Sequence, residues 1–100
     1  MLEFQDVQNI VKLVETTVLT FTNTASIKNL NSINVEGNAR AEWFVYKNLN
    51  LVQKARTSVS KHSKRINFYR HEIQINDILD VKVKHYEDDL AEFSSTLTFE

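Results

Sequence analysis

Cysteine and proline are absent from this 100-residue chain, and glycine occurs once, at Gly37. Without cysteine there can be no disulfide scaffold, zinc-thiolate site or thiol nucleophile. Phosphate-binding loops, nucleophile elbows and dinucleotide fingerprints need glycine where the backbone takes a positive φ or comes close to a ligand. A single glycine nearly excludes all three kinds of site. We therefore expect asparagine, aspartate and serine to build the turns.

Long apolar runs are missing as well. No stretch approaches the ~20 residues that a helix needs to span a bilayer. The opening MLEFQDVQNIVKLV carries acids and lacks the continuous apolar centre of a secretory signal. We therefore expect no secretion signal, no membrane association, and a cytoplasmic or virion location. A domain excised from a longer protein would look the same.

The composition that remains is typical of a folded globular domain. Hydrophobic residues make up 42% of the chain and charged residues 25%. A chain of this length can bury roughly 65% of its unfolded surface, which is enough for one core without metal or disulfide support. The sequence therefore predicts a single domain over 1–100.

The first residues repeat at helical spacing. Glu3 and Asp6 would lie in the first turn, where they suit the positive end of a helix dipole. The pattern predicts an amphipathic helix from residue 3 to about residue 15, after which ETTVLTFTNT fits either a strand or a fraying helix end. The apolar stripe consists of Phe4, Val7, Ile10, Val11, Val14 and Val18.

Strand patterns dominate from Ser26 onward. SIKNLNSINVEGN fits a short strand that ends at a turn around Gly37. The segment 39–56 alternates like a strand, but a helical reading also places apolar residues on one face. The aromatic and β-branched run WFVY, residues 43–46, favours the strand. One face of this segment would be buried and the other either buried too or covered by a partner.

The last third of the chain alternates most clearly. A hairpin closed at Asn76-Asp77-Ile78 would pair Ile73 with Val81, and a second hairpin through YEDDLAE would pair Val81 with Leu97. A register shifted by one residue would turn the core face outward. The apolar residues all have odd numbers: Ile73, Ile75, Leu79, Val81, Val83, Phe93, Leu97 and Phe99.

These patterns together predict an α+β fold. The N-terminal amphipathic helix would pack on an antiparallel sheet of four to five strands, and the last three strands would form a meander. In that meander, Tyr69 and His71 would lie on the apolar face of the sheet.

Charge is segregated along the chain. From Arg40 to Glu72 there are eight basic residues and two acids, whereas from Asp77 to Glu100 there are two basic residues and seven acids. The stretch SKHSKRINFYRH combines lysine and arginine with aromatic residues, as a groove for single-stranded nucleic acid does. The predicted hairpin argues against this function, because it sets Arg65 opposite Asp89. An overall charge of −1 also removes long-range attraction to phosphates.

Metal and catalytic sites are disfavoured by the residues present. His71 and His85 would lie diagonally across two strands, but a zinc site needs three or four ligands, and His62 is too loosely placed to supply one. Glu87 to Asp89 lack the glycine turn of a calcium loop. No serine lies in a context that would activate it. We therefore expect no metal, no cofactor, no small-molecule substrate and no enzymatic activity.

Self-association is the function that the sequence favours. The chain ends in a strand whose backbone could pair with another chain at a sheet edge. A basic and an acidic segment could also mate head to tail, as in rings or tubes of viral or phage subunits. The residues assigned to these contacts are basic Lys61, Lys64, Arg65 and Arg70, acidic Glu87, Asp88, Asp89 and Glu92, and edge-strand Phe93, Leu97 and Phe99.

Two other functions remain open on sequence alone. The chain could bind nucleic acid through residues 61–70, or it could inhibit or adapt another macromolecule. The preferred partner is a further copy of this chain or another protein. No motif resembles that of a known family.

Overall fold

The computed structural model describes residues 2–58, 63–86 and 90–100, and these ranges contain eight strands and no helix. Period-two alternation explains the strands, because alternate side chains face opposite sides of a sheet. In residues 79–85, for example, odd positions are buried and even positions are half-buried. The strands are β1 (Leu2–Val11), β2 (Thr16–Thr22), β3 (Lys28–Gly37), β4 (Ala41–Lys47), β5 (Asn50–Thr57), β6 (Ser63–Ile73), β7 (Ile78–His85) and β8 (Leu90–Phe99).

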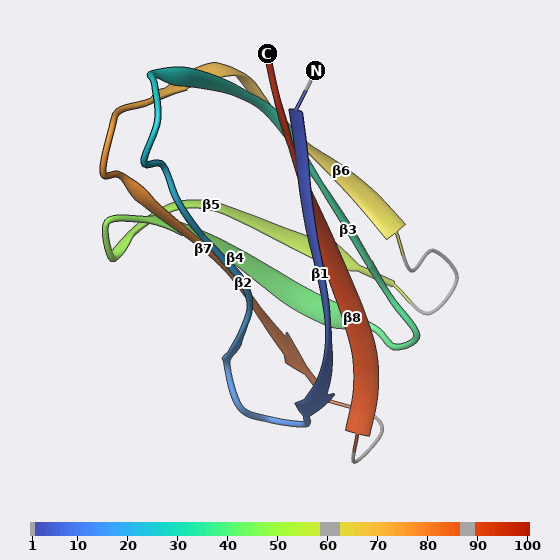
Figure 1. Ribbon diagram of the computed structural model, residues 1–100. Coiled ribbons are helices and arrows are strands. Elements are labelled where there is room, and N and C mark those ends of the chain that lie inside the picture. The colour runs from blue at the N-terminus through green and yellow to red at the C-terminus, as the bar shows by residue number, and fades with distance from the viewer. Residues whose placement is uncertain (1, 59–62, 87–89) are drawn as a thin grey trace.

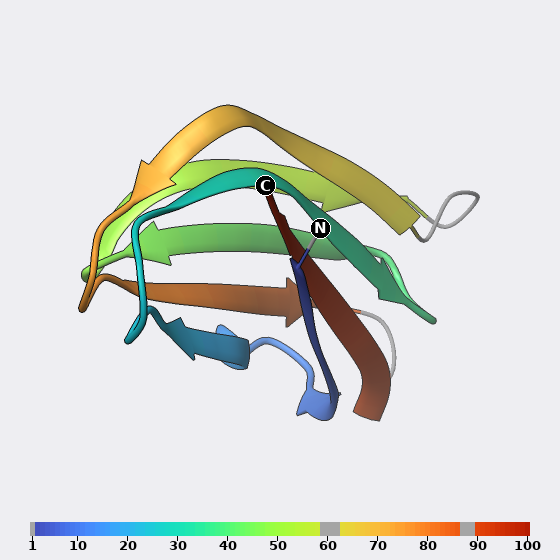
Figure 2. The same cartoon turned by 45° about the horizontal axis from the view of Figure 1, so that its top comes forward.

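The strands form two four-stranded antiparallel sheets. Sheet A has the order β1-β8-β3-β6, and sheet B has the order β2-β7-β4-β5. Consecutive strands alternate between the sheets, except that β4 and β5 form a hairpin within sheet B. This connectivity is that of an eight-stranded jelly roll. Figures 1 and 2 show β1 and β8 side by side, with the two ends of the chain close together.

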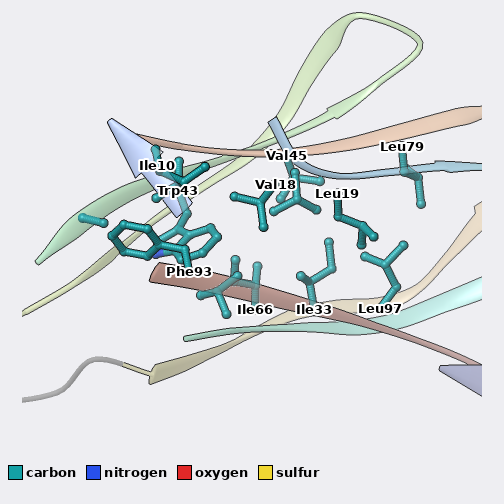
Figure 3. Packing of buried hydrophobic residues seen from close by; sticks show 14 of the residues in the cluster. Ile10, Val18, Leu19, Ile33, Trp43, Val45, Ile66, Leu79, Phe93 and Leu97 are labelled. Atoms are coloured by element: carbon teal, nitrogen blue, oxygen red, sulfur yellow. The ribbon is translucent and has the colours of Figure 1, made fainter. Parts of the chain in front are cut away.

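The core lies between the two sheets. Val45 and Leu79 of sheet B face Ile33 and Leu97 of sheet A across the layer (Figure 3). Towards one end, the ring of Trp43 meets that of Phe93 edge-on, with 5.6 Å between ring centroids. Aromatic pairs at this distance and tilt contribute beyond their buried area. The core is therefore the shared inner layer of a sandwich.

The α+β prediction is wrong, because residues 2–11 form a strand instead of a helix. All ten residues of β1 pair with β8 in an unbroken ladder. The helical stripe does not persist in the structure, since Ile10 and Val18 are buried whereas Val11 and Val14 are more than half exposed. The β-branched residues in this segment prefer a pleated strand, and tertiary pairing with β8 decides the outcome.

The C-terminal meander is also wrong. Ile73 lies opposite Lys28 of β3, and Val81 lies opposite Leu19 of β2 and Val45 of β4. Strands β6, β7 and β8 are not neighbours of one another, because each connection crosses from one sheet to the other.

The inward face of the last third is nevertheless largely as predicted. Every odd-numbered apolar residue named above is buried, with the exception of Ile75, which is 49% exposed. Tyr69 is a second departure, because it is 86% exposed and lies outside the apolar face.

The structure confirms the strand reading of residues 39–56 and bears out the expectation about turns in part, since Leu13 and Leu49 as well as Asn48 and Asn76 have a positive φ. Asn48 and Leu49 join β4 to β5 in the left-handed region, with φ of 51° and 68°. Two consecutive residues of this kind form the hairpin turn whose twist matches the strands. Asn76, with φ of 74°, lies in the crossing between β6 and β7. Asparagine therefore takes the backbone conformations that glycine usually takes.

Gly37 is required for a close approach and not for its backbone angle. It lies opposite Phe93 in the β3–β8 ladder, and a Cβ on Gly37 would overlap the Phe93 ring. The ring in turn packs against Trp43 and His85, with centroids 5.6 and 5.2 Å away. A side chain at position 37 would displace this aromatic cluster.

We expect Gly37→Ala to lower the free energy of unfolding by about 1–3 kcal/mol, because overpacking a filled core costs energy of this order. Urea denaturation followed by circular dichroism measures the change. In a double variant with Phe93→Leu, the smaller side chain leaves room for the added methyl group, so the two losses should sum to more than the measured total. Strictly additive losses would contradict the overlap.

Candidate interaction surface

Those predicted basic residues that the structure describes do not form one patch. Lys64 and Arg65 are exposed near the start of β6, and Arg70 lies at its far end beside Glu100, with 3.7 Å between Nε and Oε2. Lys61 and His62 lie outside the described residues. Arg65 is opposite Asn34 of β3, so the predicted pairing of this residue across a β6–β7–β8 meander is wrong.

Most of the predicted acidic cluster cannot be placed. Glu87, Asp88 and Asp89 lie outside the described residues. Glu92 is exposed at the start of β8, and its backbone N–H donates a hydrogen bond to Asn38 Oδ1 at 3.1 Å. The opposition between SKHSKRINFYRH and YEDDLAE therefore stays a prediction.

The assignment of Phe93, Leu97 and Phe99 to an edge strand is wrong. Strand β8 lies between β1 and β3, so its backbone pairs on both sides. All three side chains are at most 1% exposed. The alternation of apolar and polar residues in β8 marks a strand with one buried face, and it does not distinguish a central strand from an edge. The true edges are β1 and β6 in sheet A, and β2 and β5 in sheet B.

Three of these four edges carry an irregularity. In β2 the register with β7 shifts between Thr17 and Leu19. In β5 it shifts opposite Val45 and Tyr46 of β4, and in β6 it shifts opposite Leu30 and Ser32 of β3. Bulges of this kind disrupt the hydrogen-bonding row that another chain would need. β5 and β6 also carry lysine and arginine. Natural proteins use both devices to limit edge-to-edge association, although in β6 the segment 63–67 lies outside the bulge.

The irregularity in β6 is the largest. Leu30 pairs with His71 and Ser32 with Asn67, so three residues of β6 lie opposite one residue of β3. Two of the three, Tyr69 and Arg70, have positive φ of 51° and 63°. Before this bulge, the segment 63–67 pairs regularly with β3.

Strand β1 differs from the other three edges. Its ladder with β8 runs without interruption from Leu2 to Val11, and the strand contains no proline, lysine or arginine. Its charged residues are Glu3 and Asp6. The helix prediction concealed this edge, and the signal that could have revealed it is the β-branched content of residues 7–11.

On the outer face of sheet B, lysine side chains lie over aromatic rings. Phe44 and Tyr46 point outward, and the ammonium groups of Lys54 and Lys82 lie 5.9 and 5.1 Å from the respective ring centroids. The Tyr46 hydroxyl donates to Glu15 at 2.8 Å, and this hydrogen bond raises the pKa of Tyr46 above its ordinary value. Trp43, by contrast, is fully buried. The aromatic run WFVY is thus divided between the core and a lysine-covered surface.

His85 lies in the core and His71 outside it, in different sheets. His85 is fully buried, and its Nε2 lies 2.5 Å from the carbonyl oxygen of Ile10. His71 is half-buried, with Nε2 3.1 Å from Lys47 Nζ. His85 thus lines the core and contacts a backbone carbonyl through one ring nitrogen. Within the described residues, no group of three or more histidine, aspartate or glutamate side chains is arranged to hold a metal ion.

One end of the sandwich is held together by polar turn residues. Asn48 Nδ2 donates to Asp77 Oδ1 at 2.8 Å, and the backbone N–H of Gln74 donates to Asp77 Oδ2 at 2.8 Å. These two hydrogen bonds, the one from Asn48 first, lower the pKa of Asp77 below its ordinary value of 3.8. The carboxylate therefore connects the β4–β5 turn to the crossing between β6 and β7.

The lowered pKa of Asp77 predicts a pH dependence of stability. The charged carboxylate stabilises the fold above its unfolded pKa, near 3.8, and this contribution is lost as the pH falls through the lower folded value. We expect Asp77→Asn to reduce the urea midpoint at pH 6, and we expect this difference from wild type to shrink as the pH falls below 3.8. A difference that does not shrink would show that Asp77 acts without its charge.

The comparisons with known proteins do not extend these observations. No protein-family model matches the chain, and a search of curated proteins finds no significant match. Among the described residues, no helix is long and apolar enough to cross a membrane.

Proposed function

We propose that this chain is a non-enzymatic assembly module, a structural subunit that associates with further copies of itself. The observation that carries the proposal is β1. It is a ten-residue edge strand with a continuous ladder on one side, and it lacks the register shift that interrupts the other three edges and contains no proline, lysine or arginine. Main-chain hydrogen bonds along such an edge supply binding energy without a dedicated pocket.

The jelly-roll topology is compatible with this function but does not select it. Viral capsid subunits, lectins and cupins share the architecture, and a fold by itself does not determine a function. Within this proposal, a role as a subunit of a viral or phage particle is more specific than self-association in general. It is supported by the topology together with the free edge.

The oligomeric state tests the proposal. We expect the mass from light scattering to rise with concentration above the 11.7 kDa of one chain. Gln5→Lys places a lysine on β1 and should reduce this association. The matched control is Gln53→Lys, at an exposed position on the bulged edge strand β5. A wild-type chain that keeps the mass of a monomer over the whole concentration range would refute self-association.

Nucleic-acid binding is the second candidate, favoured by one observation. A surface hollow of about 350 Å³ between β5 and β6 is lined by Arg40, Arg56 and Lys64 together with hydroxyl residues. Basic side chains around such a hollow suit a phosphate group. The test is retention of single-stranded DNA or RNA at low salt by the wild type and by a Lys61→Ala, Lys64→Ala, Arg65→Ala variant. Absence of retention by the wild type at low salt would end this candidate.

A further inference from the structure

The two edges of sheet A carry opposite charge. β1 contains two acids and no basic residue, whereas β6 contains Lys64, Arg65 and Arg70 with a single acid, Glu72. Both edges have one neighbour each, β8 and β3, so the outer side of each strand faces away from the sheet. The charge pattern is therefore complementary between opposite ends of the same sheet.

The strand directions allow these two edges to meet. Three antiparallel pairings separate β1 from β6, so the two strands run in opposite directions. A second copy placed beside the first in the same orientation would bring its β1 alongside β6 of the first. The new contact would be antiparallel, as every other contact in the sheet is.

The register across the sheet identifies which residues would face each other. Asp6 lies opposite Ser95, Ser95 opposite Val35, and Val35 opposite Lys64, so Asp6 and Lys64 are the two ends of one row. A neighbouring copy with no shift along the strands would set its Asp6 opposite Lys64. The other rows are extended in the same way. Four further residues of the neighbouring copy's β1 would then lie opposite residues of β6: Glu3 opposite Asn67, Phe4 opposite Ile66, Gln5 opposite Arg65 and Val7 opposite Ser63.

This register is consistent with the irregularity of β6. The regular part of β6, residues 63–67, occupies the same rows as residues 3–7 of β1, and the bulge begins just beyond it. In the alignment, Phe4 shares the row of buried Ile66, Ile33 and Leu97. In this register the row of apolar residues Leu97, Ile33 and Ile66 continues into the apolar position 4 of the next copy, whereas a one-residue slip would break this match.

From this geometry we infer that copies of the chain associate head to tail, with residues 3–7 of β1 adding to residues 63–67 of β6 in sheet A. This inference rests on the proposed self-association and names its surface and partner. Like pairings are disfavoured, because β6 against β6 would bring together basic residues and two bulges. A head-to-tail interface uses two different surfaces, so it produces closed rings or open filaments instead of a dimer that stops at two copies.

Charge reversal tests the inference. Because Lys64 is exposed, Lys64→Asp should not change the fold, which circular dichroism can verify. It would set two aspartates opposite each other and raise the concentration for half-maximal assembly by about tenfold or more. The matched control is Lys54→Asp, at an exposed position on the bulged edge β5 of sheet B, which should assemble as the wild type does.

Mixing two variants gives the decisive result. Asp6→Lys alone should weaken assembly to a similar degree. An equimolar mixture with Lys64→Asp restores an oppositely charged pair at every contact between unlike copies and should recover the wild-type mass. If the wild type assembles and the Lys64→Asp variant assembles equally well, this inference is overturned but the proposed function is not. Self-association would then use a contact that does not involve residue 64, such as a two-fold contact between two β1 strands. A wild type that never assembles overturns the proposed function as well.

Discussion

Replacing Trp43 by alanine is expected to lower the free energy of unfolding by about 3–5 kcal/mol, the usual cost of removing a large buried aromatic side chain. Trp43 is fully buried and occupies the centre strand β4 of sheet B, with its ring against Phe93 of sheet A. Domains of this size are stable by only about 5–15 kcal/mol. The variant should therefore be largely unfolded at moderate temperature or in low urea.

Circular dichroism is the appropriate measurement, because Trp43 is the single tryptophan of the chain and its removal abolishes tryptophan fluorescence. The matched control is Phe44→Ala on the adjacent, outward-facing position, which is half-buried beneath Lys54. We expect that control to lose only about 1 kcal/mol. Equal losses at positions 43 and 44 would contradict the assignment of the two faces of β4.

Asn23→Ala is expected to lower the free energy of unfolding by about 2–4 kcal/mol, because it leaves buried polar groups without partners. Asn23 is fully buried. Its Nδ2 lies 2.8 Å from the carbonyl oxygen of Ser26 and 3.1 Å from those of Ile73 and Gln74. Its Oδ1 accepts a hydrogen bond from Lys28 Nζ at 3.0 Å. One side chain thus connects the β2–β3 loop to the end of β6.

A second substitution separates the donor role from the acceptor role. Asn23→Asp keeps an acceptor for Lys28 but places a carboxylate against three carbonyl oxygens, so it should destabilise at least as much as alanine. Asn34→Ala, at an exposed position on β3, is the control and should change stability by no more than about 0.5 kcal/mol. Urea denaturation compares the three variants. A mild effect of Asn23→Asp would mean that the amide donors contribute little.

The sequence indicates which side chains point inward much better than which strands are neighbours. The odd-numbered alternation from Ile73 to Phe99 correctly marks the buried positions apart from Ile75. A period of two is the same whether two strands share a sheet or face each other across a core. For that reason, β6, β7 and β8 could be read as a meander although each connection changes sheets.

The N-terminal strand could not be identified from local periodicity. At the even positions of residues 4–10, Asp6 and Gln8 stand between the apolar Phe4 and Ile10, so the period-two apolar pattern is broken in the sequence. The remaining apolar residues happen to fall at helical spacing. The pairing with β8 joins the two ends of the sequence, and such a distant contact leaves no mark in a short window.

The sequence predicts the type of contact, which is strand pairing with charged residues, but not the strands that form it. The sequence predicts strand pairing and a basic segment, and both recur in the proposed contact through Lys64 and Arg65, but the acidic residues of that contact lie in β1 and not in the predicted segment 77–100. The edge itself was misassigned to β8. Whether a strand lies at an edge depends on the order of all strands in the sheet, which is a global property of the topology.

The alternation of consecutive strands between the two sheets has a consequence for the speed of folding. Only β4 and β5 are neighbours in both sequence and sheet, so only this hairpin can form early through a short turn at Asn48 and Leu49. Every other ladder must close a long loop before any pairing energy is gained. Topologies dominated by such non-local pairings fold in milliseconds to seconds. We therefore expect this domain to fold slowly. The acidic strand β1 can pair only after β8, which is the last of the eight strands in sequence order, has been placed in the sheet.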